Sequence, residues 1–194
     1  MRVVGGRARG KPLRLVPGKG TRPILDRVKT ALFDILRPRI EGMRVLDLFA
    51  GSGSVGIEAL SQGAAHCTFI DLGHQAIATI KQNLLTTGFS ESCAVHQTNA
   101  LDFLRSTPRS FDLIYIAPPQ YKHLWVEAMR VLAARPDLLA AASEDNTGPG
   151  LAIAQIDPKE YESLDLGALR ETRQKRYGNT LLVFFERPGV GTAD

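Results

Sequence analysis

The chain has 194 residues, of which 44% are hydrophobic and 23% charged, a composition that suits one α/β domain and excludes a disordered or fibrous chain. No apolar run approaches the roughly 20 residues that span a bilayer, and the N-terminus lacks the features of a signal peptide, so the sequence predicts a cytoplasmic protein. The net charge of +4 is unevenly placed: residues 1–44 carry twelve basic and three acidic residues (+9), and the remainder carries 12 against 17 (−5).

The basic N-terminal segment predicts contact with a polyanion. Residues 1–20 are interrupted by Gly and Pro and are expected to form short strands or an extended arm. Basic residues at alternating positions would line one face of an extended strand, and cations that neutralise phosphates release counterions. A solvated basic arm is the alternative. The predicted RNA-binding residues are Arg7, Arg9, Lys11, Arg22 and Arg27. For Arg22, a capping or phosphate-binding role and a place near cofactor and substrate remain equally open.

The rest of the chain alternates strands with helices. An amphipathic helix is expected from Ile24 until Pro38 closes it. The expected strands are 44–49, 66–71, 94–97, 111–116 and 151–156, and the expected helices are 54–62, 75–86, 101–106 and 121–134. Two final runs, 168–175 and 180–186, flank the turn signal Gly178-Asn179 and predict an antiparallel hairpin. This order predicts a mostly parallel, doubly wound sheet whose ending is typical of methyltransferases.

A candidate cofactor site follows from three successive strand ends. The strand that carries Asp47 runs into a glycine-rich turn, where Gly51 and Gly53 allow close approach of a ligand. Asp71 ends the next strand, where it could accept hydrogen bonds from ribose hydroxyls. Asn99 follows the third strand, and its side-chain oxygen could accept from an adenine amino group. The predicted cofactor-binding residues are Asp47, Phe49, Gly51, Gly53, Asp71, Asn99 and Ala100.

Two glycines in a turn would fit NAD as well as S-adenosylmethionine. Asp47 favours S-adenosylmethionine, because a carboxylate there could hold the amino group of the methionine moiety but would repel a pyrophosphate. A nicotinamide-dependent oxidoreductase therefore stays a disfavoured alternative. The four histidines lack a spacing typical of metal ligands, so no metal is predicted.

The run Ala117-Pro118-Pro119-Gln120-Tyr121 follows the fourth strand and resembles the Asp/Asn-Pro-Pro-aromatic motif of methyltransferases that modify amino groups of bases. In that motif a side chain and a prolyl carbonyl accept from the target amine while the aromatic ring stacks on the base. Such acceptors supply positioning and charge stabilisation rather than a strong base. The candidate catalytic residues are Ala117, Pro118, Pro119 and Tyr121.

Several blocks together resemble the RsmD family of bacterial 16S ribosomal RNA guanine-N2 methyltransferases. The blocks are Val3–Arg7, Thr21-Arg22-Pro23, Asp26–Lys29, Leu32–Leu36, Leu46–Gly53, Gly56–Ser61, Gly63-Ala64 and Tyr177–Thr180. The resemblance implies a Rossmann-like methyltransferase with a seven-stranded sheet, S-adenosylmethionine as cofactor, and 16S ribosomal RNA or the small ribosomal subunit as partner. It also implies a basic RNA-docking extension at 1–40, a methyltransferase domain at 41–188 and a tail at 189–194. A monomer without metal or membrane partners is expected.

The sequence departs from the family at the chemistry motif. Ala117 stands where the family has Asp or Asn, and the aromatic residue is displaced by one position to Tyr121. Either main-chain carbonyls together with Gln120 replace the missing acceptor, or the chain keeps cofactor and RNA binding with altered or lost activity. Another amino group of RNA or DNA is a further possible target.

Overall fold

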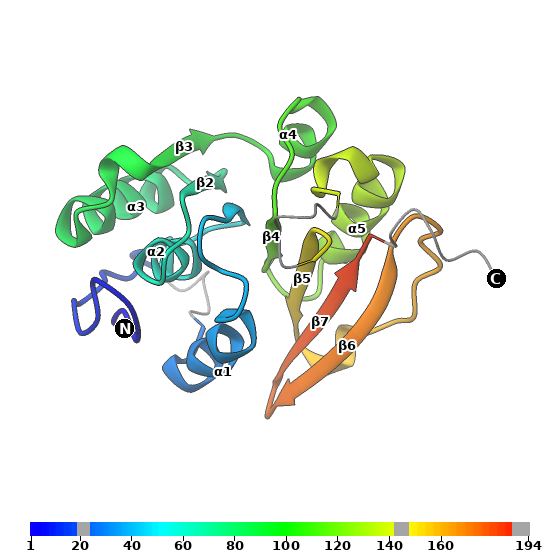
Figure 1. Ribbon diagram of the computed structural model, residues 1–194, viewed down its shortest axis with the longest axis horizontal. Coiled ribbons are helices and arrows are strands. Elements are labelled where there is room, and N and C mark those ends of the chain that lie inside the picture. Colours follow the sequence, from blue (N-terminus) through cyan, green and yellow to red (C-terminus); the bar gives the residue numbers. More distant parts are fainter. Residues whose placement is uncertain (19–23, 142–147, 188–194) are drawn as a thin grey trace.

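The computed structural model describes residues 1–18, 24–141 and 148–187. Its strands are β1 (Arg44–Leu48), β2 (His66–Asp71), β3 (Cys93–Gln97), β4 (Leu113–Ile116), β5 (Leu151–Ile156), β6 (Arg170–Tyr177) and β7 (Thr180–Glu186). They form one seven-stranded sheet in the order β3-β2-β1-β4-β5-β7-β6 (Figure 1). Strands β1 to β5 are parallel, and β7 runs antiparallel to both β5 and β6. The mostly parallel seven-stranded sheet with its C-terminal hairpin is therefore confirmed.

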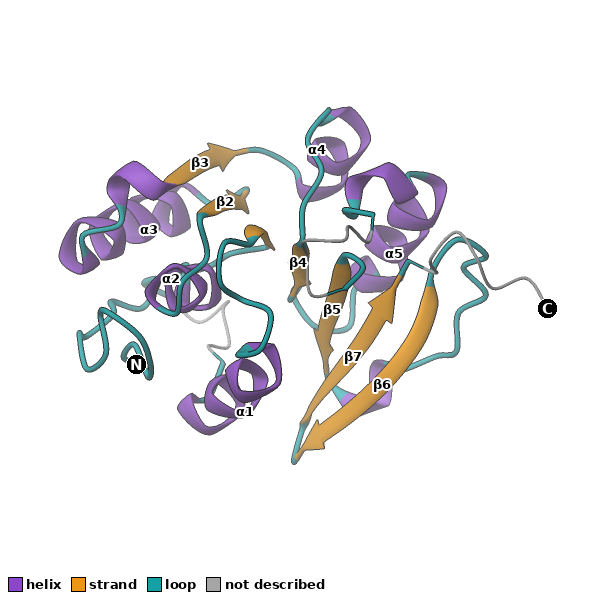
Figure 2. Cartoon of the chain, in the orientation of Figure 1, coloured by secondary structure: helices purple, strands orange, loops and turns teal. Residues whose placement is uncertain are grey.

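Helices cover both faces of this sheet (Figure 2). The helices are α1 (Asp26–Leu36), α2 (Ser54–Ser61), α3 (His74–Thr87), α4 (Ala100–Ser106) and α5 (Leu124–Ala134), with short 3-10 turns at Ser90–Ser92, Pro136–Leu138 and Pro158–Glu160. One core lies between the sheet and α1, α2 and α3, and a second lies between the opposite face and α4 and α5. Val45 and Leu46 of β1 point into different cores, as alternation along a strand requires.

Two element boundaries differ from the sequence prediction for local reasons. Helix α5 begins at Leu124 instead of Tyr121, because Tyr121 and His123 have left-handed backbones, with φ of 60° and 52°. Strand β4 begins at Leu113 instead of Phe111. The carboxylate of Asp112, just before the strand, accepts a hydrogen bond from the backbone amide of Arg44 at 2.7 Å. Most other boundaries lie within one or two residues of the predicted ones.

The N-terminal segment folds against the sheet domain and is not the extended strand that the alternating cations predicted. Residues 7–10 form a turn that follows Gly6 and ends at Gly10, and both glycines have a positive φ, of 70° and 85°. The backbone amide of Gly10 donates to the carbonyl of Val3 at 2.9 Å. Val3, Ala8 and Leu13 are buried in the same core as α1, α2 and α3. This segment is thus part of the folded body.

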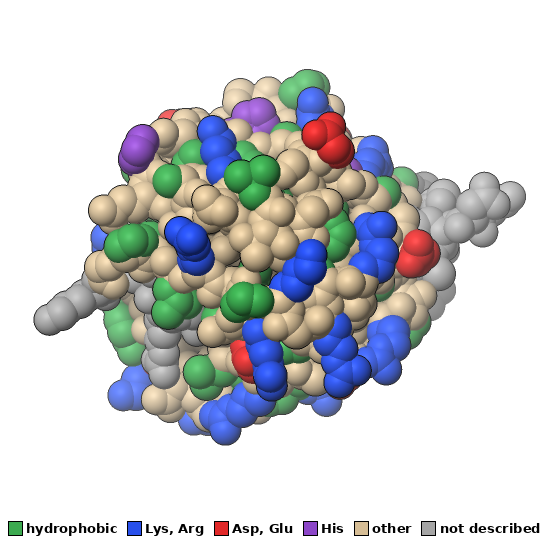
Figure 3. All heavy atoms as spheres, turned by 90° about the vertical axis from the view of Figure 1, so that its left-hand side faces the viewer, with side chains coloured by type: hydrophobic (Ala, Val, Ile, Leu, Met, Phe, Trp, Pro, Cys, Tyr) green, Lys and Arg blue, Asp and Glu red, His purple; other side chains and the backbone are tan. Residues whose placement is uncertain are grey.

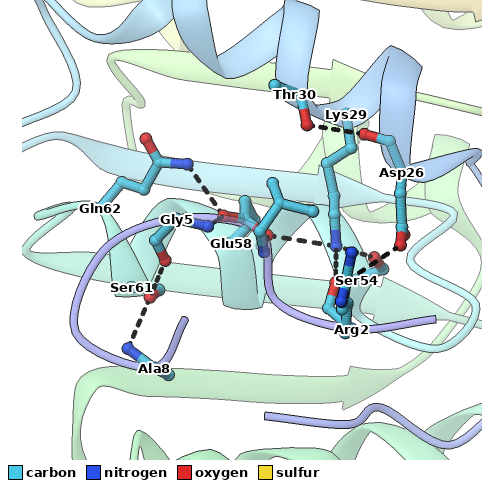
Figure 4. A network of polar contacts seen from close by, with 12 residues as sticks. Arg2, Gly5, Ala8, Asp26, Lys29, Thr30, Ser54, Glu58, Ser61 and Gln62 are labelled. Carbon is cyan, nitrogen blue, oxygen red and sulfur yellow. Dashed lines mark hydrogen bonds and ion pairs between the residues drawn. The ribbon is translucent and has the colours of Figure 1, made fainter. Parts of the chain in front are cut away.

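A buried ion pair holds the segment in place (Figure 4). Lys29 of α1 lies 3.1 Å from Glu58 of α2, and neither side chain is exposed to solvent. The Glu58 carboxylate also accepts from the backbone amides of Val4 and Gly5, at 2.9 and 2.7 Å. The Lys29 ammonium donates to the carbonyl oxygen of Arg2 at 2.6 Å. Because each charge has several partners, the pair replaces much of the hydration that it loses on burial.

Candidate active site

The predicted cofactor-binding and catalytic residues lie at one edge of the sheet. Parallel strands β1 to β5 all end at this edge, and the chain order reverses between β1 and β4, with β2 and β3 on one side and β5 on the other. Open α/β sheets bind ligands outside the carboxyl ends of their strands, at such a switch point. The candidate cofactor residues follow β1, β2 and β3, and the candidate catalytic residues follow β4.

The turn after β1 is shaped by three residues with left-handed backbones. Phe49, Gly51 and Gly53 have φ of 68°, 55° and 75°. Such a backbone is unusual for an aromatic residue, and outliers of this kind concentrate at functional sites. A Cβ placed on Gly51 would meet no heavy atom within 4 Å, whereas one on Gly53 would lie 3.3 Å from both Ile80 and Phe69. Gly51 therefore borders open space, and Gly53 lies where the turn packs onto the core.

Asp47 lies beneath this turn. The residue is 2% exposed, and its Oδ2 accepts from the backbone amide of Gly56 at 2.9 Å. Burial raises the pKa of the Asp47 carboxyl to about 7, the amide of Gly56 opposes this rise, and the Asp71 carboxylate adds to it. A cation bound above the turn would favour the ionised form of this buried carboxyl group. Gly56 was not among the predicted site residues, but a Cβ there would overlap the side chains of Phe69 and Cys67.

Asp71 connects the end of β2 to the turn. Its Oδ2 accepts from the backbone amide of Gly51 and its Oδ1 from that of Gly73, both at 2.8 Å. The residue is half-buried, and each carboxylate oxygen can accept a second hydrogen bond. Its geometry therefore fits the predicted interaction with ribose hydroxyls.

Asn99 has a different local role from the one predicted. It caps α4: its Oδ1 accepts from the backbone amides of Leu101 at 2.9 Å and Asp102 at 3.2 Å. The oxygen that was expected to accept from an adenine amino group is thus engaged with backbone amides, because the chain begins a helix at Ala100 and needs a cap there. Ala100 itself is buried, while Asn99 is exposed.

The Pro-Pro run forms an irregular loop at the end of β4. Ala117 and Pro118 are half-buried and Pro119 is exposed. Tyr121 is 62% exposed, and its backbone amide donates to Oε1 of Glu160, 2.6 Å away, which joins the loop after β4 to the loop after β5. The left-handed backbone of Tyr121 is thus stabilised by a contact with a neighbouring loop, and most of the surface of this residue is exposed.

A cavity of about 280 Å³ opens beside this loop. It is lined by Gln120, Tyr121, Asp157, Pro158, Lys159, Arg176 and Asn179. These residues come from the loops that follow β4 and β5 and from the tip of the β6–β7 hairpin. The tip of the hairpin therefore lies at the carboxyl edge of the sheet and forms one wall of a polar cavity next to the chemistry motif.

Sequence reasoning missed the residues that follow β5 and those of the hairpin. Asp157 and Lys159 come directly after a buried parallel strand, which is the same signal that identified Asp47 and Asp71. Arg176 and Asn179 gave no such signal, because the hairpin reaches the site only through the antiparallel pairing of β7 with β5.

The predicted RNA-binding residues do not gather at this edge. Arg7 donates to the carbonyl of Leu60 at 3.4 Å and lies over the ring of Phe89, 5.3 Å from its centroid. Lys11 donates to the carbonyls of Thr86 and Thr87, at 3.2 and 3.3 Å. These contacts are at the C-terminal ends of α2 and α3, which lead into the starts of β2 and β3. Arg7 and Lys11 therefore lie toward the opposite edge of the sheet.

The other three predicted cations are placed differently. Arg9 is exposed on the turn between Arg7 and Lys11. Arg27, near the start of α1, is exposed, and its Nη2 would lie 3.6 Å from a Cβ on Gly178 at the hairpin tip. Arg27 is therefore next to the cavity. Arg22 lies outside the described residues.

Among residues 1–18, 24–141 and 148–187, no group of three or more His, Cys, Asp and Glu side chains could hold a metal ion. In the same parts of the chain, none of the helices has the length and apolar character needed to cross a bilayer.

The strand order, the terminal hairpin and the glycine turn at the switch point define a Rossmann-like methyltransferase fold. The family described as "Conserved hypothetical protein 95" matches residues 1–186. The chain belongs to this family, which confirms the resemblance to the RsmD methyltransferases.

Individual relatives agree with this assignment. YlbH of Bacillus subtilis (strain 168), described as a candidate rRNA methyltransferase, is 36% identical over 97% of this chain and 100% of its own length. Ribosomal RNA small subunit methyltransferase D of Haemophilus influenzae is 38% identical over 68% of this chain and 70% of its own. Among solved structures, yhhF from Escherichia coli, described as a candidate methyltransferase, aligns with a TM-score of 0.78 and 29% identity, covering 97% of this chain and 98% of that chain.

Proposed function

We propose that the protein transfers a methyl group from S-adenosylmethionine to the exocyclic N2 amine of a guanine in 16S ribosomal RNA. The observation that carries this proposal is the placement of the glycine turn and the Pro-Pro loop on either side of one switch point, with a polar cavity beside the loop. The relatives named as small-subunit methyltransferases support the RNA substrate.

Residues after β1, β2 and β3 fit the cofactor. The open space beside Gly51 admits a ligand at the start of α2, where backbone amides favour a carboxylate. The Asp71 carboxylate is available to ribose hydroxyls, and the amide group of Asn99 can donate to a ring nitrogen of adenine. Asp47 would stabilise the amino group of the methionine moiety electrostatically. When bound, S-adenosylmethionine supplies a methyl group attached to a positively charged sulfur.

Residues after β4 and β5 fit a flipped-out base. The exposed ring of Tyr121 would stack on the guanine, and the carbonyls of Ala117 and Pro118 would accept from its N2 amine. This holds the nitrogen lone pair in line with the methyl group, so that the N–C bond forms as the C–S bond breaks and the amine loses a proton to solvent. Gln120, which lines the cavity, would supply the side-chain acceptor that Ala117 lacks.

The test is methyl transfer from labelled S-adenosylmethionine to small ribosomal subunits that lack their own modification, with the product nucleoside identified by mass spectrometry. N2-methylguanosine that is lost in Pro118→Ala and strongly reduced in Gln120→Ala is the expected result. Gln82→Ala, on α3, is the matched control and should retain activity. A different methylated nucleoside would reassign the substrate.

The alternative is a protein that binds cofactor and RNA without turnover, and Ala117 is the observation that favours it. Ala117→Asn restores the acceptor that is usual in the family. If the wild type binds S-adenosylmethionine but transfers nothing, and Ala117→Asn gains transfer, the proposed activity is wrong for this chain. Comparable rates in wild type and Ala117→Asn would support the role given to Gln120.

A further inference from the structure

Strand β6 concentrates positive charge at the outer edge of the sheet. Its eight residues include four cations, Arg170, Arg173, Lys175 and Arg176, and all four are exposed. The single acid, Glu171, accepts from the hydroxyl of Tyr161 at 3.1 Å and from the amide of Gln174 at 2.7 Å. Within a body that is net negative outside the N-terminal segment, this strand is a local positive stripe.

Cross-strand pairing shows how the cations are distributed over the two faces. Arg173 pairs with Phe184 and Lys175 with Leu182, and both partners belong to the core on the α1 side. Side chains of directly paired residues lie on the same face, so these two cations extend that face beyond the edge of the core. Arg176 pairs with Leu181, in the opposite core, and lines the cavity. The stripe therefore reaches both sides of the edge.

The stripe is continuous with the candidate active site. Arg176 and Lys159 line the cavity that also contains Tyr121. Arg27 approaches the hairpin tip from α1, with its Nη2 3.6 Å from the position of a Cβ on Gly178. Cations from a helix, a loop and an edge strand thus converge next to the motif that would hold the target base.

Arg7 and Lys11, in contrast, are engaged with carbonyls at the C-terminal ends of α2 and α3. Figure 3 looks onto the side formed by α1, α2, α3 and the N-terminal segment, and basic side chains gather in its lower half. The cations next to the site are therefore Arg27, Lys159 and Arg176, and not those of the turn at residues 7–10.

We propose that β6, together with Arg27, is the main phosphate-binding surface of the protein and docks the sugar-phosphate backbone of an RNA helix beside the flipped target base. Successive residues on one face of a strand are about 6.7 Å apart, so Arg173 and Lys175 would contact separate phosphates. Charge complementarity identifies the ligand, because the one aromatic residue of β6, Tyr177, packs against the core and does not form a platform for bases along the strand. This inference rests on the proposed RNA substrate and adds the surface that binds it.

The test compares three triple variants that each lose three positive charges. Arg170→Gln/Arg173→Gln/Lys175→Gln removes the stripe but spares the cavity. Arg7→Gln/Arg9→Gln/Lys11→Gln removes the predicted N-terminal cations, and Arg105→Gln/Arg109→Gln/Arg130→Gln is a control near α4 and α5. Affinity for small subunits and for a short blunt-ended RNA duplex is measured over a range of salt concentrations, with cofactor affinity and thermal unfolding measured in parallel.

We expect the β6 variant to bind both RNAs at least tenfold more weakly and to show a shallower salt dependence, by about two to three released ions. Its cofactor affinity and melting temperature should match those of the wild type, and the α4–α5 control should bind RNA normally. Wild-type affinity in the β6 variant, or an equal loss in the N-terminal variant, overturns the proposal. So does a loss confined to assembled subunits, which would identify a protein partner.

These binding measurements are independent of turnover. If the wild type transfers no methyl group but binds the duplex in a β6-dependent way, the proposed reaction fails and the docking surface stands. If methyl transfer is normal in the β6 variant and its RNA affinity is unchanged, the reaction stands and the docking surface fails.

Discussion

Lys29 and Glu58 face each other at 3.1 Å with both side chains excluded from solvent. Burial lowers the pKa of the Lys29 ammonium, and the Glu58 carboxylate opposes this change. The pair joins α1, α2 and the first residues of the chain, because each charged group also binds backbone of the N-terminal segment. Removing either charge would leave the other buried without its partner.

Lys29→Met is therefore expected to lower the free energy of unfolding by about 3 to 5 kcal/mol, and the double variant Lys29→Met/Glu58→Gln should recover part of that loss. Urea denaturation measures both. The control is Arg37→Ala, which breaks an exposed pair with Asp34 and should cost about 0 to 1 kcal/mol. A Lys29→Met variant as stable as the wild type would show that the pair contributes little.

Asp47→Asn should raise the free energy of unfolding and lower the affinity for the cofactor. Since the folded-state pKa of about 7 lies above the ordinary value of 3.8, ionised Asp47 destabilises the folded protein at neutral pH. The stability gained by Asp47→Asn should thus be absent below about pH 4, grow as the pH rises toward 7 and stay constant above it. Its upper limit is about 4 kcal/mol.

Thermal unfolding without cofactor at pH 5 and pH 8 checks this pH dependence, with Asp34→Asn as an exposed control. Calorimetric titration of S-adenosylmethionine should show affinity weakened by about tenfold or more in Asp47→Asn. Equal stability of variant and wild type at both pH values would contradict the buried position of the carboxylate.

Gly56 of α2 and Gly51 of the turn before it should respond differently to substitution by alanine. Gly56→Ala places a methyl group against Phe69 and Cys67 and should destabilise the fold by about 1 to 3 kcal/mol. Gly51→Ala borders open space and should cost only the strain of a left-handed backbone, about 1 to 2 kcal/mol. Gly88→Ala is its matched control, with φ of 84° and equally open surroundings at the end of α3.

Gly51→Ala and Gly88→Ala should therefore lose similar stability, while Gly51→Ala alone should lose cofactor affinity. Denaturation and cofactor titration on the same samples separate the two effects. Unchanged cofactor affinity in Gly51→Ala would place the ligand elsewhere.

Tyr121→Ala should weaken RNA binding while leaving the fold intact. Stacking of a base on an aromatic ring contributes about 1 to 3 kcal/mol, so KM for RNA should rise by roughly 5- to 150-fold, and Tyr121→Phe should keep most of the wild-type value. Leu85→Ala removes another exposed apolar side chain, on α3, and should leave KM unchanged. Equal KM values for Tyr121→Ala and Tyr121→Phe would exclude stacking.

The order of elements and the cofactor edge could be predicted because they depend on local patterns. The run Val45–Leu48, apolar except for Asp47, predicts a buried strand, and Gly51 and Gly53 predict a turn that a ligand can approach closely. Sheet order then brings Asp71 beside Gly51, since parallel strands share an edge.

Other features depend on contacts between distant segments and could not be predicted in this way. Arg7 and Lys11 alternate as a strand would, yet Ser61 and Thr87 hold their turn against α2 and α3. The basic residues of β6 are positioned by two pairings between distant segments. Strand β7 pairs antiparallel with β5, and β6 pairs with β7, which places Arg176 at the cavity. The net charge of the chain does not show that these basic residues lie together on one strand.

Asn83 of α3 bonds to two separate segments. Its side chain accepts from the amide of Arg14 at 2.8 Å and donates to the carbonyls of Arg14 and Ser52, at 3.0 and 2.9 Å. The N-terminal segment and the glycine turn therefore share one buried anchor. Detachment of the segment in a local opening would therefore also loosen the turn. Because coupling between two sites is reciprocal, a cofactor bound at the turn should stabilise the attached segment. Hydrogen exchange at the amides of Val4, Gly5 and Arg14, which lie outside the cofactor site, should then become slower.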